Sequence, residues 1–83
     1  MWNVKYFFSQ LWFAGFMKIF AERLKELRTE KGLTIIRLAK NTNLSKSALA
    51  YWENCRRIPN AEAIITLAKY FNVSSDYLLG LAD

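Results

Sequence analysis

The stretch TIIRLAKNTNLSKSALAYWENCRRIP, residues 34–59, decides the fold of this chain. It predicts two short helices joined by a tight turn. Thr34 and Ser45 are favourable N-caps for the first and the second helix, because a hydroxyl oxygen can accept a hydrogen bond from a free backbone N–H of the first turn. Asn43 is the expected corner, since asparagine adopts the left-handed conformation more readily than most residues other than glycine.

The second helix of this pair, predicted from Lys46 to about Asn54, divides into two faces. Leu49 and Trp52 lie on one side at a spacing of three, which predicts that this side packs on the core. The opposite side carries Lys46, Ser47, Ala50 and Tyr51. The sequence therefore predicts a helix with one buried face and one face that is free to contact another molecule.

Three further helices are predicted around this pair, from apolar residues that recur at spacings of three and four. Gly32 and Gly80 are expected to end the helices that precede them, because glycine takes a left-handed conformation without steric cost. The first spans residues 18–31, and the last runs from Ser75 to about Leu79. Between them, Asn60 caps a helix that carries Ile64, Leu67, Ala68 and Phe71. The expected fold class is all-α, a compact bundle of five helices.

Residues 1–16 form an apolar N-terminal arm that holds seven of the thirteen aromatic residues of the chain. Alternating apolar residues predict a strand over residues 2–8, whereas spacings of three and four from Ser9 onward predict a helix that runs through Gly15 into the next helix. Four interpretations of the arm stay open: extra core for its own domain, a dimerisation element that pairs with a second copy, contact with a membrane surface, or a segment without function. In the last case translation would begin at Met17.

Length and charge narrow the range of functions. Eighty-three residues make one domain, divided here into the arm (1–16) and a main domain (17–83). The formal net charge is +5, with positive charge concentrated in residues 32–57 and a net negative charge in residues 58–83. This asymmetry favours one side that faces a polyanion, although solvated helix faces would produce a similar pattern.

The residues that catalysis and metal binding need are scarce in this chain. It has no histidine and one cysteine, which excludes an internal disulfide and argues against a metal site or hydrolytic chemistry. We therefore expect no enzyme and no cofactor.

The twelve residues between Lys5 and Lys18 are fewer than the ~20 needed to cross a bilayer, and no secretory signal is convincing. A cytoplasmic protein without a membrane partner is expected.

The arrangement of these residues is specific enough to resemble the phage-repressor and Cro-like helix-turn-helix family, also called the Xre family. The likeness covers about residues 17–83 and rests on Leu27-Arg28, Lys31 to Thr34, Leu38-Ala39, the helix capped by Ser45, Trp52 to Asn54, Pro59 and the tail from Phe71 to Gly80. It implies a bundle of the lambda-repressor-like type and a sequence-specific transcriptional regulator that binds double-stranded DNA. The simplest form is a repressor that acts as a homodimer on a near-palindromic operator. The alternative is an antitoxin or another protein-interaction module with auxiliary DNA binding, whose protein partner would be held by the arm.

The resemblance also implies roles for individual residues. Arg28 and Glu53 match a structural ion pair of the family, and Tyr51 either contacts DNA or covers Trp52. The positions that match base-reading residues are Lys46, Ser47, Ala50 and Tyr51, and those that match phosphate-binding residues are Thr34, Lys40, Asn54, Arg56 and Arg57. The candidates for a dimer interface are Trp2, Tyr6, Phe8 and Trp12 in the arm and Tyr77, Leu78 and Leu81 near the C-terminus, although Leu78 or Leu79 must also close the core.

Two positions depart from the family pattern. Ile35 stands where glutamine is common, and together with Ile36 it suggests that this end of the helix packs against an apolar partner, for which the arm is a candidate. Cys55 stands where glycine is usual. It is either a small residue tolerated in a turn or, next to Arg56, a thiol open to oxidation.

Overall fold

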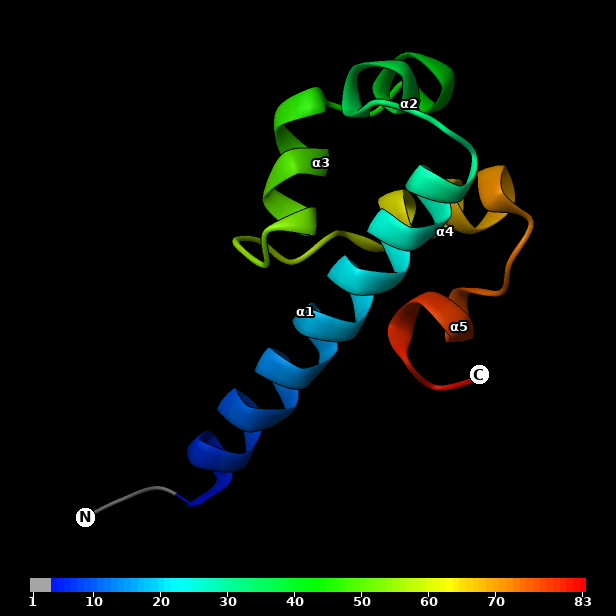
Figure 1. Cartoon of the computed structure of the whole chain (residues 1–83). Coiled ribbons are helices and arrows are strands. Elements are labelled where there is room, and N and C mark those ends of the chain that lie inside the picture. Colours follow the sequence, from blue (N-terminus) through cyan, green and yellow to red (C-terminus); the bar gives the residue numbers. More distant parts are fainter. Residues whose placement is uncertain (1–3) are drawn as a thin grey trace.

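The structure is a computed structural model that describes residues 4–83, with side chains from residue 15 onward. Within the described residues the chain forms five helices and every regular element is helical (Figure 1). The helices are α1 (Val4–Glu30), α2 (Ile35–Thr42), α3 (Lys46–Glu53), α4 (Ala61–Phe71) and α5 (Ser75–Leu79). The predicted all-α bundle of five helices is confirmed.

All five helices contribute apolar side chains to one core. α1 packs against both α3 and α5, so the first and the last helix of the chain are in contact. The Trp52 ring of α3 meets the Phe20 ring of α1 edge-on, with 6.4 Å between centroids. The largest fully buried side chains are Phe20, Leu24, Leu38, Leu49, Leu67 and Leu78.

The turn between α2 and α3 has the predicted geometry. Thr34 Oγ1 accepts a hydrogen bond from the Arg37 backbone N–H at 3.1 Å, and Ser45 Oγ accepts one from that of Ala48 at 3.2 Å. Asn43 lies in the left-handed region at φ 61°. Each helix therefore begins at a side-chain cap, and the corner between them is made by a residue that tolerates its backbone angles.

The arm is the main difference from the sequence-based expectations. The strand predicted over residues 2–8 is wrong from Val4 on, because α1 begins there and runs through Gly15 without interruption. A lone strand would leave its backbone N–H and C=O groups without partners, whereas a helix pairs them internally. Figure 1 shows the first turns of α1 projecting away from the other helices, so the interpretation of this part as extra core of its own domain is not supported.

Part of the predicted arm lies outside what can be described. Trp2 precedes the described residues, and the side chains of Tyr6, Phe8 and Trp12 are outside the described set. Among the described residues, no helix is both long enough and apolar enough to span a membrane.

Candidate nucleic-acid interface

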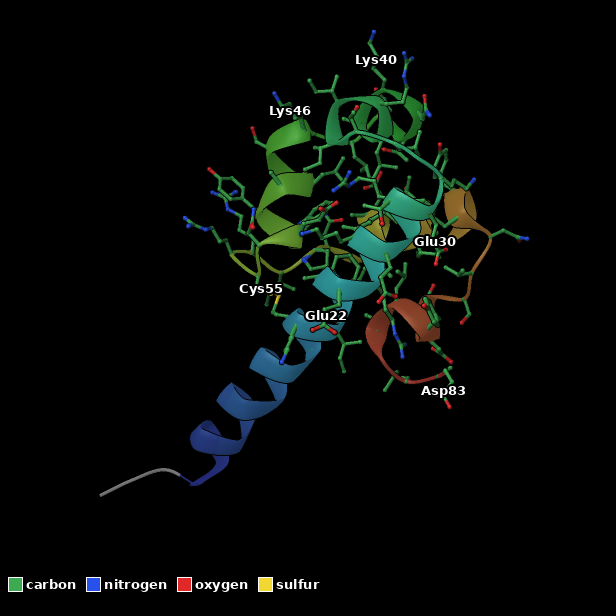
Figure 2. All side chains as sticks on the ribbon, viewed as in Figure 1. Glu22, Glu30, Lys40, Lys46, Cys55 and Asp83 are labelled. Carbon is green, nitrogen blue, oxygen red and sulfur yellow. The ribbon has the colours of Figure 1, made fainter. Side chains whose placement is uncertain are left out.

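α3 presents a polar face outward and an apolar face inward, as its sequence predicts. Leu49 and Trp52 are buried against the core, with 0% and 6% of their surface exposed. Lys46 and Ser47 are exposed at the start of the helix, and Figure 2 shows Lys46 pointing away from the domain. Tyr51 is exposed and Ala50 is half-buried on the same side. The four residues predicted to read bases therefore share one surface, which a duplex can reach.

Tyr51 and Arg57 lie together, which the sequence did not suggest. The Arg57 guanidinium carbon lies 4.7 Å from the centroid of the Tyr51 ring, a cation–π distance. The contact depends on a chain reversal after α3, where Cys55 has a left-handed φ of 58° and the Arg56 N–H bonds to the Tyr51 carbonyl oxygen at 2.8 Å. Sequence spacing alone does not indicate such a reversal at a cysteine.

The five residues predicted to hold phosphates are all exposed, but three of their side chains are engaged within the chain, one of them being that of Arg57, which stacks on Tyr51. Thr34 Oγ1 caps α2, so only the free backbone N–H groups of that helix end remain for an anion. The Asn54 side-chain amide donates to the Ala50 carbonyl oxygen at 2.8 Å. Lys40 points outward at the same end of the molecule as Lys46 (Figure 2). Arg56 and Arg57 follow α3.

The ion pair expected between Arg28 and Glu53 is present and fixes the last residue of α3. Arg28 Nε donates to Glu53 Oε2 at 2.7 Å, and Arg28 Nη2 donates to Glu53 Oε1 at 3.0 Å. Its Nη1 donates to the Leu33 carbonyl oxygen at 2.7 Å, so one guanidinium ties α1, the loop before α2 and α3 together. The hydrogen bond and charge of Glu53 raise the pKa of Arg28 above its usual value, against an opposing effect of burial. Arg28 is thus charged throughout the physiological pH range.

The apolar end of α2 does not contact the arm. Ile35 packs against the core of its own domain, while Ile36 remains 54% exposed. The first turns of α1 lie at the opposite end of the molecule (Figure 1). The suggestion that the arm covers this pair is therefore wrong for the described part of the arm, because a continuous α1 carries it away from α2.

Cys55 occupies a position where the backbone favours glycine. Its left-handed φ explains why glycine is usual there, and its Sγ lies 3.6 Å from the Met17 carbonyl oxygen. The thiol is free and the residue is exposed. This geometry agrees with a small residue tolerated in a turn.

The C-terminal candidates for a dimer interface divide into three kinds. Leu78 is completely buried, so its prediction as an accessible interface residue is wrong: it closes the core of its own domain. Tyr77 is half-buried, and the Arg23 guanidinium lies 4.2 Å from its ring centroid while donating to the Tyr77 carbonyl oxygen. Leu81 is 71% exposed and remains available to a partner.

Two short helices joined by a tight turn, the second with an outward polar face, have the arrangement of a helix-turn-helix, and the half-buried ion pair holds the end of the second helix. Residues 24–78 match the helix-turn-helix family HTH_3, which is the Xre, Cro and C1 type. The chain belongs to this family of helix-turn-helix DNA-binding domains.

Three curated relatives are similar to this chain. The HTH-type transcriptional activator BcrR of Enterococcus faecalis is 40% identical over 60 residues, which is 72% of this chain and 29% of that protein. The uncharacterized HTH-type transcriptional regulator YobD of Bacillus subtilis is 34% identical over 65 residues, 78% of this chain and 58% of that protein. The HTH-type transcriptional regulator ImmR of Bacillus subtilis is 37% identical over 59 residues, 71% of this chain and 46% of that protein. The chain thus spans between about a third and somewhat more than half of the length of these relatives.

Proposed function

We propose that this protein is a sequence-specific DNA-binding regulator that binds a near-palindromic operator as a homodimer and represses transcription by occluding a promoter. The observation that carries this proposal is the outward face of α3, which begins at a capped N-terminus with Lys46 and Ser47 and has Tyr51 and Arg57 stacked beside it. A helix that enters the major groove by its N-terminal end meets a different pattern of donors and acceptors at each base pair.

In this mechanism the base-reading and phosphate-binding residues have separate tasks. Lys46 donates to guanine O6 and N7, and Ser47 hydrogen-bonds base edges next to it. Tyr51 contacts a thymine methyl group or a phosphate. The phosphates are held by the N-terminus of α2 at Thr34 and by Lys40, Asn54, Arg56 and Arg57, which set the register of α3 on the duplex.

The first experiment is selection of bound sites from randomised duplex DNA at low and near-physiological salt. We expect an inverted repeat with half-sites about one helical turn apart. Lys46→Ala and Ser47→Ala should change the selected sequence, whereas Arg57→Ala should weaken all sequences similarly. Equal losses for the three variants on selected and random DNA would contradict the assignment of base readers.

Whether the protein represses or activates transcription needs its own measurement, because one relative is named as an activator. A reporter with the selected site across the promoter should lose expression when the protein is supplied. Increased expression from a site placed upstream, without loss from the overlapping site, would replace repression by activation and leave sequence-specific binding intact.

A further inference from the structure

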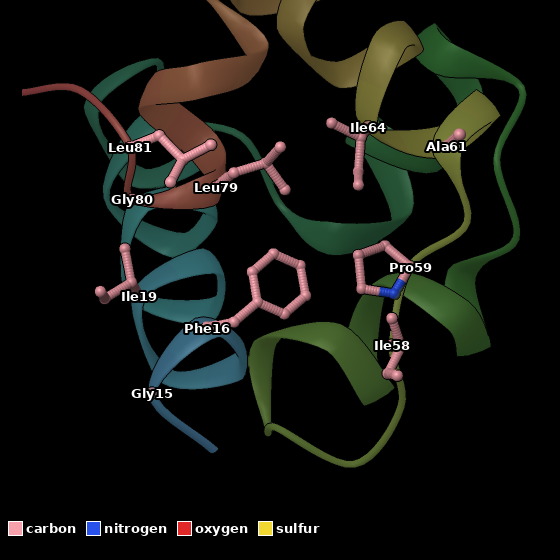
Figure 3. A pocket seen from close by; sticks show the side chains of 10 residues that line it. All are labelled: Gly15, Phe16, Ile19, Ile58, Pro59, Ala61, Ile64, Leu79, Gly80 and Leu81. Atoms are coloured by element: carbon pink, nitrogen blue, oxygen red, sulfur yellow. The ribbon is translucent and has the colours of Figure 1, made fainter. Parts of the chain in front are cut away.

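An apolar groove opens where the arm leaves the domain. It has a volume of about 540 Å³ and is lined by residues from α1, from the loop before α4, from α4 itself and from the C-terminal end of the chain. Figure 3 shows Phe16 projecting from α1 toward Pro59, with Ile19 and Leu81 on the other side of the groove. The lining residues include none with a charged side chain. Two of them stay highly exposed, Ile58 at 52% and Leu81 at 71%.

We propose that a second copy of this chain fills this groove with its arm, the N-terminal part of α1, in a reciprocal dimer. The inference rests on the homodimer of the proposed function and names its interface. The arm of the same chain cannot fill the groove, because α1 is one continuous helix that forms a wall of the groove at Gly15 and Phe16 and then continues away from it. A twofold axis near Gly15 would place each arm across the groove of the other copy.

The composition of the arm fits the groove. Helical spacing places positions 8 and 12, a phenylalanine and a tryptophan, on the face of α1 that carries Phe16 and Ile19. The first sixteen residues contain Lys5 as their one charged side chain. Position 5 lies on this face one turn before position 8, and a lysine there would pack its apolar stem and keep its ammonium group in water. A Cβ built at Gly15 meets nothing within 4 Å, which leaves the mouth of the groove open to a second helix.

The available area is sufficient for a stable dimer. A buried aromatic side chain removes roughly 150–250 Å² from solvent, so the two arm aromatics on this face would bury about 300–500 Å². In a reciprocal dimer each copy buries an arm and a groove of matching area, which gives about 600–1,000 Å² per copy. A standard interface needs about 800 Å² per partner.

The test is sedimentation equilibrium of the full-length chain and of three variants. Ile58→Glu places a charge in the groove, and Trp12→Glu places one on the arm. Ile65→Glu is the matched control, because Ile65 is 49% exposed, close to the 52% of Ile58, and does not line the groove. The first two variants should raise the dimer dissociation constant at least about thirtyfold, as loss of an interface hot spot does, while the control should leave it unchanged. Circular dichroism checks that each variant keeps its helical content.

A mixture of the two damaging variants distinguishes this arrangement from other dimers. Ile58→Glu retains an intact arm and Trp12→Glu an intact groove, so a mixed dimer keeps one undamaged contact. Mixing should therefore restore dimers at concentrations where each variant alone is monomeric.

Three results would overturn the inference. Loss of dimer in Trp12→Glu but not in Ile58→Glu would mean that arms pair only with arms. An unchanged dimer in both would move the interface elsewhere. A monomeric parent chain that sediments with phosphatidylglycerol vesicles would assign the arm to a lipid surface. DNA selection with Ile58→Glu, whose α3 surface is intact, tests the proposed function separately from the interface.

Discussion

Replacing Glu53 with alanine is the sharpest test of how α3 is held. The change removes both carboxylate oxygens that accept hydrogen bonds from Arg28, at 2.7 and 3.0 Å. The guanidinium would keep its hydrogen bond to the Leu33 carbonyl oxygen. The side chains of Arg28 and Glu53 are only 14% and 6% exposed, so water cannot fully replace the lost partner. The charge of Arg28 would then be mostly buried and only partly compensated.

The expected cost follows from this burial. Removing one partner of a buried ion pair costs ~3–5 kcal/mol. Because 14% of the Arg28 side chain still reaches solvent, we expect the lower end, a loss of about 3 kcal/mol in the free energy of unfolding. At ~4–8 °C per kcal/mol for a domain of this size, the melting temperature should fall by about 12–24 °C.

Urea unfolding monitored by circular dichroism measures the loss, with Glu30→Ala as the control. Glu30 is an exposed acidic residue at the end of α1, and its replacement should change stability by no more than about 0.5 kcal/mol. The double variant Arg28→Met/Glu53→Ala should recover part of the loss, because it removes the stranded charge as well as its partner. A cost below about 1 kcal/mol for Glu53→Ala, additive with that of Arg28→Met, would refute the view that this pair fixes α3.

Four further substitutions test other parts of the domain. Gly32→Ala and Gly80→Ala both place a side chain at a positive φ, 68° and 79°, but only at Gly80 does the new Cβ approach Ile19, at 3.0 Å. In urea unfolding Gly80→Ala should therefore cost about 1 kcal/mol more than Gly32→Ala, and equal costs would show that Ile19 moves aside freely. Cys55→Gly should raise the free energy of unfolding by about 0.5–1 kcal/mol in the same assay. The strain that glycine relieves at φ 58° is larger than the free energy lost to glycine's extra freedom in the unfolded chain. A lower stability of the variant would contradict this account. Arg57→Ala should reduce the slope of log K against log salt by about 1 if Arg57 binds a phosphate, and an unchanged slope would exclude that contact.

The elements that the sequence predicted correctly depend on local chemistry. Thr34 and Ser45 cap their helices and Asn43 makes the corner, because each of these residues stabilises its backbone conformation through its own side chain. The free face of α3 followed from the spacing of Leu49 and Trp52 in the same way. Such features need no knowledge of the rest of the fold.

The features that were missed depend on contacts distant in the chain or on ambiguous patterns. In a segment such as residues 4–14, apolar residues recur every second position over part of the length and every third or fourth position over the rest. Periodicity alone therefore cannot decide between a strand and a helix. Whether Leu78 or its neighbour faces the core depends on how α5 packs against α1. The stacking of Arg57 on Tyr51 needs the left-handed turn at Cys55, which an inventory of capping residues does not reveal.

α1 connects the groove to α3, so we can test whether a change in the groove alters how α3 is positioned on DNA. From Phe16, which lines the groove, to Arg28, which holds Glu53, α1 is a continuous helix that rises about 18 Å at 1.5 Å per residue. In the proposed dimer, an arm seated in the partner's groove would therefore fix the direction of one α3 relative to the other. Selection from a library with variable spacing between half-sites should show that Ile58→Glu broadens the accepted spacing while each half-site keeps its sequence. Lys46→Ala should do the opposite, changing the half-site and keeping the spacing. If Ile58→Glu left the spacing preference as sharp as in the parent chain, the distance between the two α3 helices would have to be set by another surface, with the half-buried Tyr77, which does not line the groove, as the next position to test.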